Sequence, residues 1–84
     1  MTACLQIDFE AAEGALLRII GLVERRGYRV RELSLTEHSA HSSLSLLIAA
    51  RDDQRRPDVL ARQISNLVDV ISITLTPDRP MVPA

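Results

Sequence analysis

The feature that most constrains this chain is an apolar pattern of helical length, set between two glycines, that leads directly into a strand-like pattern. Between Gly14 and Gly27, apolar residues recur at the spacing that lines one face of an α-helix. These residues are Leu16, Ile19, Ile20 and Val23. Gly27 stands where a helix C-terminus favours a residue free to adopt positive φ. From Tyr28 onward apolar and polar residues alternate, so the sequence predicts a helix, a tight turn and a strand.

Other segments of the chain show the alternation of apolar and polar residues that is typical of half-buried β-strands. They lie at residues 3–9, 43–50 and 70–76. The strand expected at 28–37 changes phase midway, and a β-bulge near Arg31 and Glu32 would return its leucines to the apolar side. A second helix is expected to begin near Pro57, because proline is favoured in the first turn of a helix. The expected order of elements is βαββαβ.

The βαββαβ order predicts an α+β domain of ferredoxin-like architecture. Right-handed crossovers would place two helices on one face of a four-stranded antiparallel sheet, with the second and fourth strands at its edges. The 84 residues suffice for a single domain, expected over residues 1–76, and a proline-containing C-terminal tail is expected at 77–84. A chain this short buries a limited share of its surface, and sheet edges invite pairing, so we expect a homodimer.

Composition excludes several classes of function. The formal net charge of −1 provides no broad basic field for nucleic acid, and Phe9 and Tyr28 both fall on the apolar phase rather than on a base-stacking surface. The single Cys4 excludes an internal disulfide and a paired-thiolate metal carrier, and it fits a reducing compartment. The sequence has no membrane-spanning apolar run and no charged leader, so we expect no membrane association and a cytoplasmic protein.

Few residues offer catalytic or metal-binding chemistry. The loop at 10–13 is acidic and lacks the arginine that a phosphate-cradling enzyme of this architecture requires. His38 and His41 have no cluster of further ligands near them in sequence, and we interpret them as solvated turn residues. The remaining candidate is the start of the first helix, where free N–H groups can hold a carboxylate and a glycine admits a ligand close to the backbone. A simple tight turn into a helix explains the same residues, and both interpretations stay open.

Several short runs carry a resemblance to a known family. The runs Glu13-Gly14-Ala15-Leu16, Arg18-Ile19-Ile20-Gly21-Leu22 and Arg26-Gly27-Tyr28 resemble the opening of an ACT domain. With Asn66-Leu67-Val68-Asp69-Val70, they resemble the small regulatory subunit of acetolactate synthase (acetohydroxyacid synthase) over roughly residues 3–76. The resemblance implies a non-catalytic, activating subunit in branched-chain amino-acid biosynthesis, with no cofactor in this chain. Thiamine diphosphate, Mg²⁺ and FAD are then expected in the large subunit.

Two other functions remain open beside the subunit role. One is a free-standing ACT domain that binds a small amino acid and regulates another enzyme. The other is a ferredoxin-like enzyme of unknown chemistry. A gene for a large thiamine-dependent subunit next to the gene for this chain would favour the subunit role, and turnover by the purified chain would favour the enzyme.

The resemblance also implies an effector site, because ACT domains bind an amino acid at this loop, between two domains packed side by side. We assign to this site Glu13, Gly14, Ala15, Leu16 and Arg29. Valine-sensitive small subunits usually carry asparagine where this chain has Ala11 and Arg29, so both amides are missing. The chain also ends where longer small subunits continue, and it looks more like the short, valine-resistant type. We therefore expect weak binding of branched-chain amino acids, or none.

The docking surface for the large subunit is expected on the exposed side of the first helix and the turn after it. This segment contains an arginine cluster with too few nearby carboxylates to balance it. The cluster comprises Arg18, Arg25, Arg26 and Arg29. A solvated face explains the same arginines equally well.

Overall fold

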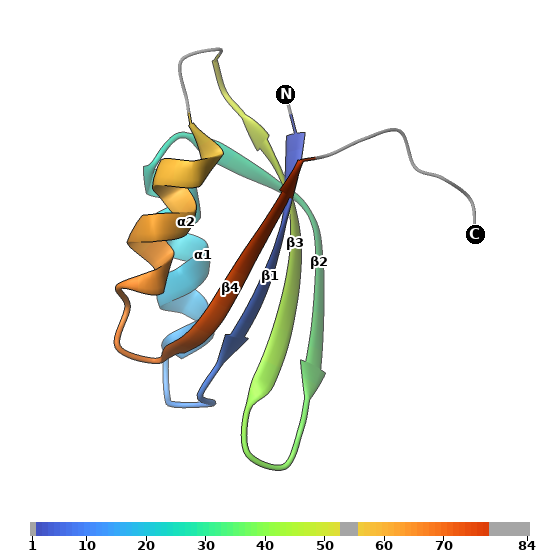
Figure 1. Ribbon diagram of the computed structural model, residues 1–84, viewed down its shortest axis with the longest axis vertical. Helices are drawn as coiled ribbons and strands as arrows, with labels where there is room; N and C mark the ends of the chain where they lie inside the picture. Colours follow the sequence, from blue (N-terminus) through green and yellow to red (C-terminus); the bar gives the residue numbers. More distant parts are fainter. Residues whose placement is uncertain (1, 53–55, 78–84) are drawn as a thin grey trace, which may run out of the picture.

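The structure, a computed structural model, describes residues 2–52 and 56–77. Its elements are β1 (Thr2–Phe9), α1 (Ala15–Arg25), β2 (Tyr28–Glu37), β3 (Ser42–Ala50), α2 (Pro57–Ser65) and β4 (Val70–Pro77). The four strands form one antiparallel sheet in the order β2-β3-β1-β4, and both helices pack on the same face of it (Figure 1). The predicted ferredoxin-like fold is confirmed, with the second and fourth strands at the edges.

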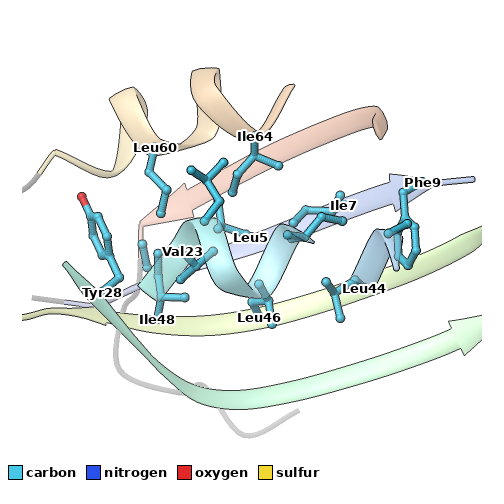
Figure 2. Close-up of a cluster of buried hydrophobic side chains, with 14 residues drawn as sticks. Leu5, Ile7, Phe9, Val23, Tyr28, Leu44, Leu46, Ile48, Leu60 and Ile64 are labelled. Atoms are coloured by element: carbon cyan, nitrogen blue, oxygen red, sulfur yellow. The ribbon is translucent and has the colours of Figure 1, made fainter. Parts of the chain in front are cut away.

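The core lies between the sheet and the two helices and consists almost entirely of aliphatic side chains. Figure 2 shows side chains from both helices facing those of the sheet. The innermost residues, each at most 1% exposed, are Leu5, Ile7, Ala15, Ile19, Val23, Leu44, Leu46, Ile48, Leu60 and Ile64. Dense packing of such side chains makes the core sensitive to the loss of even a few carbon atoms. Neither of the described helices is long and apolar enough to cross a membrane.

Helix α1 turns a different face to the sheet from the one that its large apolar residues predicted. Its buried residues are Ala15, Ile19, Leu22 and Val23. Leu16 and Ile20, expected on the buried face with Ile19 and Val23, are only half-buried. The prediction counted large side chains and left out Ala15 and Leu22, which the structure places on the buried face. On the side of α1 that faces the end of β2, Leu17 remains 75% exposed.

The predicted bulge in β2 is confirmed. The register between β2 and β3 shifts between Val30 and Glu32, so Arg31 has no partner in β3. This extra residue turns Leu33 and Leu35 to the helix side of the sheet. The helices do not cover this part of the edge strand, and the two leucines remain 48% and 39% exposed. The β2 edge therefore displays apolar side chains next to an unpaired backbone.

Strand β4 extends one residue further than predicted. Pro77, expected in the tail, is the last residue of β4 and stands opposite Ala3. Proline is tolerated on an edge strand because the N–H groups on its outer side have no partner strand to bond to. The rest of the expected tail, residues 78–84, lies outside the described residues.

The segment between α2 and β4 also departs from its predicted pattern. The spacing of Leu60, Ile64 and Leu67 predicts one apolar stripe with Val68 at its edge, but α2 ends at Ser65 and both Leu67 and Val68 lie in the turn after it. Leu67 still packs against the core, whereas Val68 is 89% exposed. Ile71, expected on the same face as Ile73 and Leu75, falls at a register shift between β1 and β4 and is 57% exposed.

Candidate functional site

The loop between β1 and α1 leads into a helix N-terminus that no side chain caps. Gly14 occupies the N-cap position in the left-handed region, with φ 79°, and offers no side-chain hydrogen bond to the first turn. The N–H of Arg18 donates to the Gly14 carbonyl oxygen at 2.9 Å, which closes that turn. Helix geometry leaves the N–H groups of Leu16 and Leu17 without an acceptor inside the helix. These backbone donors are available to a polar or anionic group.

An apolar groove of about 310 Å³ opens beside this helix start, between it and the end of β2. Its lining residues are Phe9, Ala11, Ala12, Gly14, Leu16, Leu17, Leu35, Glu37 and Ser42. Leu17 is 75% exposed, and Glu37 is the one charged side chain among these lining residues. The groove can therefore receive an apolar group, with backbone donors and a single carboxylate close by.

The predicted effector-site residues are divided between two ends of the molecule. Glu13, Gly14, Ala15 and Leu16 are consecutive at the helix start. Of these, Gly14 and Leu16 line the groove. The Ala15 side chain is 1% exposed, on the side of α1 that packs against the core. Arg29 lies near the start of β2, because a strand that follows a crossover helix begins at the far end of the sheet. Arg29 also pairs with Ala49 of β3, so its side chain lies on the helix-free face of the sheet, away from the groove.

The second wall of the groove is what sequence reasoning did not find. Leu35, Glu37 and Ser42 come from the end of β2 and the start of β3, and Ser42 stands opposite Phe9 of β1. The alternation of β2 predicts Leu35 on the helix side. No local pattern, however, tells how far α1 extends over the strand, and this decides whether Leu35 is covered.

An ion pair joins the helix start to the turn between α2 and β4. The Arg18 guanidinium pairs with the carboxylate of Asp69, whose side chain is 14% exposed. The N–H of Glu10 donates to the Asp69 carbonyl oxygen at 2.8 Å. A Cβ at Gly14 would lie 3.2 Å from the Arg18 guanidinium, so glycine leaves room for that side chain. The β1–α1 loop and the α2–β4 turn, both at the lower end of the molecule in Figure 1, are thus connected.

The arginines expected to form a docking cluster are dispersed. Arg18 pairs with Asp69 near the start of α1, whereas Arg25 and Arg26 lie at the other end of this helix. Arg29 lies on the opposite face of the sheet. Arg18 and Arg25 lie seven residues apart, about 10.5 Å along α1, and Arg29 lies across the sheet, so the four arginines do not form one cluster.

The helix-free face of the sheet carries a chain of hydrogen bonds that includes one of the histidines. The Ser43 hydroxyl donates to the Asp8 carboxylate at 2.8 Å, and the Ser72 hydroxyl donates to it at 3.2 Å. His38 Nε2 lies 3.1 Å from Ser43 Oγ, and its ring stacks on that of His41. The Ser43 hydrogen bond lowers the pKa of Asp8, and the Ser72 hydroxyl and both histidines act in the same direction. Among the described residues, no group of three or more His, Cys, Asp or Glu is placed to hold a metal ion.

Comparison with known proteins connects these features to a family. The family model of the ACT domain matches residues 11–73. The chain is 31% identical over 64 residues to the probable acetolactate synthase small subunit of Methanothermobacter thermautotrophicus, covering 76% of this chain and 38% of that protein. It is 28% identical over 74 residues to the acetolactate synthase isozyme 3 small subunit of Escherichia coli, covering 88% and 45% respectively. The chain thus spans less than half the length of these relatives.

Solved structures show the same fold at lower sequence identity. The ACT domain of the GTP pyrophosphokinase from Chlorobium tepidum matches with a TM-score of 0.74 at 16% identity, over 89% of this chain and 96% of that one. Formyltetrahydrofolate deformylase from Burkholderia mallei matches with a TM-score of 0.72 at 21% identity, over 90% of this chain and 28% of that one. The match to the family model contains the helix start and both walls of the groove except Phe9, and the chain belongs to the ACT domain family.

Proposed function

We propose that the chain acts as a non-catalytic regulatory subunit of an acetolactate synthase. The observation that carries this proposal is the similarity to acetolactate synthase small subunits over 76% to 88% of the chain. In this role the large subunit would hold thiamine diphosphate, Mg²⁺ and FAD, and this chain would contribute no catalytic group. It would act by binding the active conformation of the large subunit more tightly than the inactive one.

A homodimer through the β2 edge is part of the proposed function. The helix side of this edge exposes Leu33 and Leu35, and Leu17 of α1 lines the same groove as Leu35. A two-fold axis through this edge would pair the two β2 strands in antiparallel orientation. Such pairing would extend the sheet across both copies and remove the leucines from water.

In this dimer the groove would lie at the joint between the two copies. A second copy would then provide the wall that one chain leaves open. An effector held there would contact backbone donors at the start of α1 and apolar side chains from both β2 edges. The alternative function, a free-standing ACT domain that binds an amino acid and regulates another enzyme, would use the same groove.

Valine, leucine and isoleucine are expected to bind this groove with a Kd of about 1 mM or weaker. Ala11 has no side-chain amide for the charged groups of the ligand, and the Glu37 carboxylate repels the ligand's own carboxylate. Isothermal titration calorimetry with each amino acid measures the affinity, and Glu37→Gln, which removes the repulsion, should bind the same ligands more tightly. A low-micromolar Kd for the wild-type chain would contradict this prediction and favour the alternative function.

Activation of the cognate large subunit tests the proposed function directly. Adding the purified chain should raise acetolactate formation about tenfold, which requires only about 1.4 kcal/mol of preference for the active conformation. The rate is followed by the formation of acetolactate from pyruvate, with heat-unfolded chain as the control. Absence of both activation and co-sedimentation with the large subunit would refute the subunit role.

A further inference from the structure

The turn between β2 and β3 holds its two histidines against each other. The imidazole rings of His38 and His41 are stacked, with their centroids 4.6 Å apart and their planes at 21°. The His38 N–H donates to the His41 carbonyl oxygen at 2.8 Å, so the two residues continue the ladder beyond the last pair, Glu37 and Ser42. The histidines therefore stand directly opposite each other, at the lower end of the sheet in Figure 1.

Hydrogen bonds on the helix-free face determine which nitrogen of His38 carries a hydrogen. The Ser43 hydroxyl has one proton, and it donates this proton to the Asp8 carboxylate at 2.8 Å. Ser43 Oγ can therefore only accept a hydrogen bond from His38 Nε2, which lies 3.1 Å away. Nε2 of His38 thus bears a hydrogen, and a further proton binds at Nδ1 without breaking the hydrogen bond to Ser43.

Asp8 is the charged group that faces the two histidines from the sheet. Its carboxylate interacts electrostatically with both rings, and the hydrogen bond from Ser43 lowers its pKa, so it is ionised wherever histidine titrates. The neighbouring side chains on the same face of β3, β4 and β2 are uncharged hydroxyls, those of Ser43, Ser72 and Thr36. Glu37 is next to His38 in the chain but lies on the helix side, where it lines the groove.

The stacked pair accommodates one proton better than two. Histidine is the side chain that changes its charge between about pH 5 and 8. A single charge on His38 keeps the hydrogen bond to Ser43 and is attracted by the Asp8 carboxylate. A second proton places like charges on rings that lie directly opposite each other, and this destabilises the pairing of the strands. Acidification should therefore separate the rings and loosen the turn.

We propose that His38 and His41 form a proton-operated switch, which loosens the outer wall of the groove at the start of α1 when both rings are protonated. Glu37 and Ser42 connect the two places. They line the groove, and they form the last ladder pair before the turn, each next to one of the histidines in the chain. The groove keeps its shape at neutral pH and loses it at acidic pH. This inference concerns the chain alone and does not rest on the subunit role.

NMR spectroscopy of the isotopically labelled chain tests the switch as the pH is lowered from about 8 to about 5. Nuclear Overhauser effects between the two imidazole rings should be present at the start and absent at the end. Over the same interval the resonances of the Phe9 ring and the Leu35 methyl groups should shift, because both side chains line the groove. Neither residue is next to a histidine in the chain, so these shifts report on the groove itself.

Two variants separate charge repulsion from other effects of pH. His41→Phe keeps an aromatic ring opposite His38 but cannot carry the second charge, so its rings should stay in contact and the groove resonances should stay in place throughout the titration. Ser39→Ala is the matched control within the same turn and should respond as the wild-type chain does. Circular dichroism at both ends of the titration checks that each chain is folded.

Three results would overturn the proposal. The first is a wild-type chain whose rings remain in contact at the acidic end of the titration. The second is an equal response in His41→Phe, since repulsion needs two charges. The third is separation of the rings with unchanged resonances at Phe9 and Leu35, which would confine the effect to the turn and refute control of the groove.

Discussion

Leu35→Arg should convert the chain from a dimer to a monomer at concentrations of tens of micromolar, with self-association weakened at least about 100-fold. Leu35 lies on the β2 edge at 39% exposed and lines the groove with Leu17. A two-fold interface contains every substitution twice, so two guanidinium groups would enter the apolar joint together. Burying an unpaired charge costs several kcal/mol, which exceeds the roughly 2.7 kcal/mol that a 100-fold loss requires.

Thr36→Arg is the matched control for this substitution. Thr36 is the next residue of the same edge strand, and alternation points it to the helix-free face. This variant should therefore remain dimeric. Analytical ultracentrifugation over a range of concentrations measures both variants and the wild-type chain. A monomeric wild-type chain, or a Leu35→Arg variant as dimeric as wild type, would contradict pairing through the β2 edge.

Leu5→Ala should destabilise the domain by about 2–5 kcal/mol, through lost apolar burial and the cavity left behind. Leu5 is fully buried in the central strand β1, where it stands between Leu46 of β3 and Leu75 of β4. A domain of this length has a total stability of only about 4–13 kcal/mol, so the loss is a large share of it. The melting temperature should fall by about 10–30 °C in thermal scans followed by circular dichroism.

Gln6→Ala is the internal comparison for the core substitution. Gln6 is adjacent in β1 and exposed on the helix-free face of the sheet. Its replacement should change stability by no more than about 0.5 kcal/mol, since it removes no buried contact. Equal melting temperatures for the two variants would mean that Leu5 does not lie at the centre of the packed core.

The elements of the fold could be predicted because their signals are local. The alternation of β1 and β3 and the helical spacing of α1 depend on residues a few positions apart, and the sequence contains them directly. The bulge at Arg31 was also predictable, because without it Leu33 and Leu35 would fall on the opposite face from Val30. Once the order βαββαβ is known, crossover handedness leaves few ways to arrange the sheet.

The candidate site was only partly predictable because its second half depends on tertiary placement. Gly14 and the helix start are visible in the sequence, and glycine is required there by a positive φ. The groove wall at Leu35 depends on how α1 is rotated over the sheet, and the structure buries Ala15 and Leu22 where the spacing of large apolar residues favoured Leu16 and Ile20. Arg18 and Asp69 are 51 positions apart, and no spacing rule relates residues at that distance.

The central place of β1 in the sheet also has a consequence for how the chain is made. Of the four strands described, β1 is synthesised before the others, yet it pairs with β3 and with β4, the latest of the four. On the ribosome, β2 and β3 can form their hairpin early, while one side of β1 has no partner until β4 has emerged. Contacts between such distant segments slow folding, so the complete sheet forms late in synthesis. Until then, one edge of β1 has unpaired backbone N–H and C=O groups, to which a strand of another chain can pair.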